Sequence, residues 1–346
     1  MTRGSPLRPL LFVVMASGTS LAWGPGRART EVRCLAGENG PSDTTKSSQD
    51  RQGLDAFISH ASQDVELAER VERVLEANSL TVWLDRSEIR LGALLRNELQ
   101  TAIKNSRVVI LLWSSAAARS RWIAAEVLTA FHLGRFVVPC LRGKAPLPYF
   151  LQSAVYLNLR SRTDVWEELL RRAVRESPDT ANEVLPVWTN RDPVLQQAIG
   201  RIAAAQYDVV NQLGVDLQSA RKKQHLATAL IVEAEKTWPL EPMILNLAGY
   251  HYKNAYMVRH WPAIQAGRPP NDALLERADG YFFNALFVNP NDYSALNGLG
   301  STLLLERELD AAEFFVGRAV TLAERDGVDY GAAKQDLEMI VRMTRG

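Results

Sequence analysis

The chain has 346 residues, which is enough for about two domains of ordinary size. Hydrophobic residues make up 47% and charged residues 23%, so a disordered or collagen-like chain is excluded. Lys and Arg number 40 against 39 for Asp and Glu, and there are only two cysteines. This composition argues against a general nucleic-acid binder and excludes a disulfide scaffold or a four-cysteine zinc site.

Residues 1–53 are predicted to be a leader outside the folded domains. Arg3 and Arg8 precede a short apolar run that starts at Leu10, and the pattern resembles a weak secretory signal. The run is too short to cross a bilayer as a helix. We therefore expect a cytoplasmic protein, with export or membrane association as the alternative if residues 1–22 act as a signal.

Short apolar runs alternate with amphipathic segments over residues 54–175, and this alternation predicts a parallel sheet covered by helices on both faces. Val108–Trp113 is a continuous apolar run, as expected of a central strand. The predicted strands are 55–59, 81–85, 108–113, 136–139 and 155–159, and the predicted helices are 64–78, 94–104, 120–134 and 163–174.

Residues 176–192 contain Pro178 and Pro186 and are predicted to be a linker, after which the pattern is purely helical. Small residues recur in residues 193–346 with a period of 34, as in the pair Ala278 and Ala312. Such a period resembles tetratricopeptide (TPR) repeats. We expect three TPR-like units, a final capping helix, and an inserted segment around 255–271, containing Trp261 and Pro262, that forms a loop packed on the repeats.

Four segments of the first domain, taken together and in this order, resemble a Toll/interleukin receptor (TIR) domain of the bacterial kind. They are Asp55–His60, Val82–Asp85, Glu88–Gly92 and Ser120–Glu126. The resemblance covers about a third of the chain and implies a flavodoxin-like parallel sheet.

TIR domains are either adaptors that only self-associate or enzymes that cleave NAD at the nicotinamide–ribose bond. The enzymes use a glutamate on the third helix, four residues after an aromatic residue, and Trp122 and Glu126 match this spacing. Residues four apart share one face of a helix, and ligands of doubly wound sheets bind beyond the carboxyl ends of the strands. The resemblance thus implies Glu126 as the catalytic residue, with a substrate-binding set of Trp122, Ser59, Asp85, Trp83 and Arg90.

The first loop, which contains His60 and Ser62, lacks the basic residue that many TIR domains have there. Ser87–Gly92 matches the self-association segment of the family. No glycine-rich phosphate loop follows a strand and no metal-ligand spacing is present, so NAD+ is expected as a substrate and not as a bound cofactor.

We therefore predict an NAD+ hydrolase that is activated by assembly and acts in bacterial defence. Its expected partners are NAD+, other TIR domains, and a protein or peptide bound to the TPR-like region, with no nucleic acid. The alternative is a non-enzymatic TIR adaptor that works through TIR–TIR and TPR–peptide contacts. A third possibility is an enzyme resembling nucleoside deoxyribosyltransferases, which have a related fold and also use a glutamate.

Overall fold

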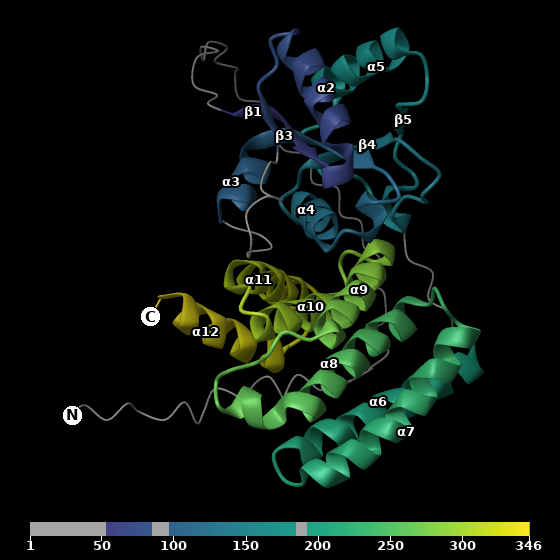
Figure 1. Ribbon diagram of the computed structural model, residues 1–346, viewed down its shortest axis with the longest axis vertical. Coiled ribbons are helices and arrows are strands. Elements are labelled where there is room, and N and C mark those ends of the chain that lie inside the picture. The colour runs from purple at the N-terminus through teal and green to yellow at the C-terminus, as the bar shows by residue number, and fades with distance from the viewer. Residues whose placement is uncertain (1–52, 85–96, 185–191, 346) are drawn as a thin grey trace, which may run out of the picture.

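The computed structural model describes residues 53–84, 97–184 and 192–345, and Figure 1 shows its two parts. A sheet domain comes first, and an array of helices follows it. Within the described residues, no helix is long and apolar enough to cross a membrane.

The sheet domain is built on five parallel strands in the order β2-β1-β3-β4-β5. This order starts in the middle of the sheet and proceeds to both edges, as in flavodoxin-like folds, so the predicted fold class is confirmed. The last strand is shorter than predicted, because Val155 is 89% exposed and only two residues pair with β4. The strands are β1 (Leu54–Ser59), β2 (Val82–Leu84), β3 (Ser106–Trp113), β4 (Phe136–Leu141) and β5 (Leu157–Asn158).

Helices cover both faces of the sheet because side chains of a strand alternate between its faces. Ala56 and Ile58 pack against α2 (Val65–Glu76) and α5 (Thr163–Glu176). Phe57, between them, packs on the opposite face, where α3 (Asn97–Asn105) and α4 (Arg121–His132) lie. Three short 3-10 helices lie in the connections: η1 (Ser62–Asp64), η3 (Ala117–Arg119) and η4 (Tyr149–Leu151).

The helical array consists of consecutive helices that pack in pairs, with α12 packed on the last pair. The residues that recur with the 34-residue period lie between helices: Ala278 and Ala312 are both completely buried. Small side chains at these positions allow close helix packing. The helices are α6 (Pro193–Leu213), α7 (Leu217–Thr237), α8 (Pro242–Gln265), α9 (Ala273–Val288), α10 (Tyr293–Leu305), α11 (Leu309–Arg325) and α12 (Gly331–Arg345).

The inserted segment differs from the prediction, because much of it is helical and not a loop. α8 continues to Gln265 and passes through Trp261, which is buried, and Pro262. The backbone at His260 departs from helical angles (φ −113°, ψ 16°). A proline in a helix removes a backbone hydrogen bond and clashes with the preceding turn, so the helix bends there but does not end.

The α3 and α4 layer lies between the sheet and the helical array (Figure 1). One continuous hydrophobic cluster extends from Val109 of β3 through Leu128 of α4 to Phe282 of α9. The two parts of the chain therefore share a core, and the array is packed against the helix that carries Glu126.

Candidate functional site

Glu126 lies in the second turn of α4 and is completely buried. The helix begins after Ser120, whose Oγ accepts a hydrogen bond from the backbone N–H of Ile123 (3.3 Å). Trp122, one turn before Glu126, is half-buried and packs on the hydrophobic cluster shared with the array. The predicted catalytic carboxylate and its aromatic neighbour thus share one side of a firmly packed helix.

Ser59 and Trp83 lie on the sheet face that α3 and α4 cover. Ser59 is the last residue of β1, two residues after Phe57, and its Oγ has no hydrogen-bond partner among the described residues. The ring of Trp83 stacks on that of Phe57, with centroids 5.0 Å apart and an interplanar angle of 14°. The structure therefore places both residues on the same side of the sheet as α4. Asp85, Arg90 and the segment Ser87–Gly92 lie outside the described residues.

A polar cluster that the sequence did not reveal joins three loops at the carboxyl edge of the sheet. Asp64, after β1, is almost completely buried; it accepts a hydrogen bond from Ser114 Oγ after β3 (2.5 Å) and pairs with Arg142 after β4. The positions of Ser114 and Arg142 directly after a strand were an available signal. In the sequence, however, Asp64 looks like an ordinary acidic residue of a helix's first turn.

A second missed residue is Thr129, three residues after Glu126 on α4. Its side chain is completely buried, and its Oγ1 has no hydrogen-bond partner among the described residues. Together with Trp122 and Glu126 it follows the i, i+4, i+7 spacing of one side of a helix. A buried hydroxyl at this spacing adds a donor and acceptor beside the candidate carboxylate.

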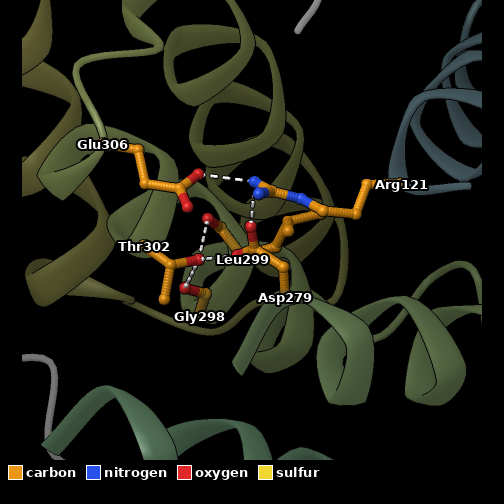
Figure 2. A network of polar contacts seen from close by, with 6 residues as sticks. All are labelled: Arg121, Asp279, Gly298, Leu299, Thr302 and Glu306. Atoms are coloured by element: carbon orange, nitrogen blue, oxygen red, sulfur yellow. Dashed lines mark hydrogen bonds and ion pairs between the residues drawn. The ribbon is translucent and has the colours of Figure 1, made fainter. Parts of the chain in front are cut away.

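The first residue of α4 joins the sheet domain to the array through an ion-pair network (Figure 2). Arg121 Nη2 pairs with Asp279 Oδ2 of α9 and with Glu306 Oε2 after α10, the latter at 2.5 Å. Thr302 Oγ1 hydrogen-bonds to Asp279 Oδ1. Burial raises the pKa of Asp279 well above its usual range, and the charge of Arg121 opposes that rise. We refer to Arg121, Asp279, Thr302 and Glu306 as the Arg121 cluster.

The last residue of α4 also contacts the array. His132 is buried, and its ring is hydrogen-bonded to the backbone carbonyl of Pro290. Burial, together with the nearby charge of Arg318, lowers the pKa of His132 from 6.5 to about 3. The histidine is therefore neutral at physiological pH.

Two comparisons with known proteins found a similarity. Residues 56–174 match the family model of the TIR domain, and with the observed fold this places a TIR domain at these residues. A probable 2′ cyclic ADP-D-ribose synthase, TcpO from Methanobrevibacter olleyae, is 28% identical over 89 residues. That stretch covers 25% of this chain and 26% of the relative, so the chain spans about a quarter of the relative's length.

Among the described residues, no group of three or more His, Cys, Asp or Glu side chains is placed to hold a metal ion. The candidate site consists of two groups of residues: Glu126 with its neighbours on α4, and the polar cluster around Asp64 at the sheet edge. The array contacts α4 directly.

Proposed function

We propose that this protein cleaves NAD+ at the nicotinamide–ribose bond and that Glu126 is its catalytic residue. The observation that supports this most directly is the position of Glu126: a carboxylate one turn after Trp122, on the helix next to the carboxyl edge of a TIR-domain sheet. The name of the relative from Methanobrevibacter olleyae, a cyclic ADP-ribose synthase, points to the same class of chemistry.

A single carboxylate suffices for this reaction. Nicotinamide leaves a pyridinium as a neutral molecule, so no acid has to protonate it. The ribose then acquires oxocarbenium character, which a nearby anion stabilises, as in glycoside hydrolysis. Glu126 supplies this anion, while Ser59, Trp83 and Trp122 contribute the walls that orient the dinucleotide.

The product depends on which nucleophile attacks the ribose. Attack by water gives ADP-ribose, and attack by a group of the same molecule gives a cyclic product. Because the relative's name specifies a cyclic ADP-ribose, we propose that the products be separated by chromatography and that both be quantified.

The decisive experiment is release of nicotinamide from NAD+ by the purified full-length protein and by Glu126→Gln, which keeps the shape of the side chain and removes its charge. We expect the substitution to reduce the rate by about 10²-fold or more, the range found for single electrostatic groups in catalysis. Glu66→Gln is the matched control, because Glu66 is exposed on α2, on the opposite face of the sheet.

A fully active Glu126→Gln protein with an unchanged circular dichroism spectrum would remove Glu126 from the mechanism. If the wild-type protein releases no nicotinamide even when concentrated, the adaptor hypothesis is favoured. The proposed partner of the helical array is a protein or peptide, and other TIR domains are the proposed partners of the sheet domain.

A further inference from the structure

α4 is held by the helical array along its whole length. Four of its side chains follow the i, i+4, i+7, i+11 spacing of one helix stripe: Arg121, Ala125, Leu128 and His132. The two apolar members are completely buried in the cluster shared with the array. The two polar members, at the ends of the helix, contact Asp279, Glu306 and the carbonyl of Pro290.

The Arg121 cluster makes this attachment depend on one charge. The array contributes two carboxylates, and the Asp279 side chain is 0% exposed and that of Glu306 13%. α4 contributes the guanidinium of Arg121, which pairs with both of them. Removing one member of a buried ion pair leaves an uncompensated charge, which is far more unfavourable than losing an exposed pair. The docked position of the array is therefore sensitive to Arg121.

The array also reaches the edge of the sheet where substrate is expected. The ring centroid of Phe287, on α9, lies 6.3 Å from that of Trp113, the last residue of β3. It lies 6.4 Å from that of Phe150 in η4. α9 thus packs both on the helix that carries Glu126 and on the connections at the carboxyl edge.

In this arrangement Glu126 is completely buried, whereas a carboxylate must touch the ribose to stabilise its positive charge. Glu126 lies outside the stripe of α4 that faces the array, so the array acts on it by fixing the position of α4. We propose that the helical array restrains the NAD-cleaving site by holding α4 through the Arg121 cluster, and that release of α4 from the array allows the rearrangement that brings Glu126 into contact with a dinucleotide. This inference rests on the proposed function, and it assigns to the array the regulation of that same site.

The test compares initial rates of nicotinamide release by dilute full-length proteins. Arg121→Gln should raise the rate about tenfold or more, because a tenfold population shift requires only ~1.4 kcal/mol. The double variant Asp279→Asn, Glu306→Gln weakens the attachment from the array side and should also raise the rate of nicotinamide release. Arg121→Lys keeps the positive charge, so its rate should lie between those of Arg121→Gln and the wild-type protein. Arg119→Gln is the control, because Arg119 is exposed two residues before Arg121.

A second readout does not require catalysis. Hydrogen exchange of the backbone amides of residues 121–132 should be faster in Arg121→Gln than in Arg119→Gln, while α2 and α5, on the other sheet face, exchange as in wild type. This measurement separates the release of α4 from the chemistry at Glu126.

The inference is overturned if the Arg121 and Asp279/Glu306 variants fold but release nicotinamide at the wild-type rate or more slowly. Lower rates would mean that the array positions α4 for catalysis and does not restrain it. If neither the variants nor the wild-type protein cleave NAD+, faster hydrogen exchange in α4 of Arg121→Gln still supports the restraint by the array. In that case the proposed NAD-cleaving activity is wrong. Unchanged exchange in that case refutes the restraint as well.

Discussion

The pKa of His132 shows how strongly burial and a nearby charge change the ionisation of one side chain. It lies at the end of α4, between the sheet domain and the array, where burial and Arg318 lower its pKa from 6.5 to about 3. Between these two pH values the unfolded chain binds a proton that the folded chain does not. Stability contributed by the neutral ring is thus fully present above pH 6.5 and is lost as the pH falls toward 3.

We expect the free energy of unfolding to fall by a few kcal/mol between pH 6.5 and pH 4 in the wild-type protein, and by less in His132→Gln, which does not titrate. Urea unfolding at several pH values measures how the free energy of unfolding of each protein changes with pH. His225→Gln is the control, since that side chain is exposed on α7. The same pH dependence of the free energy of unfolding in His132→Gln and in the wild-type protein would contradict the role given to His132.

At the scale of elements, the close approach of α10 and α11 depends on Gly300. A Cβ added there would lie 2.4 Å from Val316 Cγ2, 3.1 Å from Val316 N and 3.2 Å from the Ala312 carbonyl oxygen. Two of these neighbours are backbone atoms, which cannot move aside as a side chain can. Gly317, in contrast, has nothing within 4 Å of the corresponding position.

Gly300→Ala should therefore lower the free energy of unfolding by about 1–3 kcal/mol, the usual effect of overpacking. Gly317→Ala should raise it by about 0.5–1 kcal/mol, because alanine loses less backbone entropy than glycine in a helix. Chemical denaturation of both variants measures the difference. Equal effects at the two positions would mean that helix propensity, and not the contact between α10 and α11, decides the outcome.

For the whole molecule, the array limits which surfaces of the TIR domain are accessible for self-association. The α3 and α4 face is packed against the array, whereas α2 and α5, on the opposite face, have no such cover (Figure 1). We predict that this protein acts after its TIR domains assemble. In the docked state, association must use surfaces other than the α3 and α4 face.

Association of the chains increases with protein concentration, so the specific activity of nicotinamide release should rise with it. A dilution series from micromolar to nanomolar protein, with sedimentation measured on the same samples, tests this dependence. Specific activity that stays constant while the oligomeric state changes would refute activation by assembly.

Much of the sheet domain was predictable because its signals are local. The apolar runs Val108–Trp113 and Ala56–Ile58 indicate buried strands, and the spacing of Trp122 and Glu126 indicates one side of a helix. Ala278 and Ala312, which are 34 residues apart, are both buried in the array, whereas the assignment to TPR repeats stays a prediction. The inserted segment was predicted wrongly, because Pro262 suggested a loop whereas the burial of Trp261 stabilises a bent helix.

The sequence by itself therefore determined the succession of strands and helices along the chain, the fold class and the helix that carries Glu126. Only the tertiary structure decided that the array packs on α4 and that Arg121 pairs with residues 158 and 185 positions away in the chain. The physical reason is that periodicity reports which side of an element is apolar, but not which distant element covers it. That choice depends on shape and on buried charges, such as Asp279, that become paired only when the two parts of the chain meet.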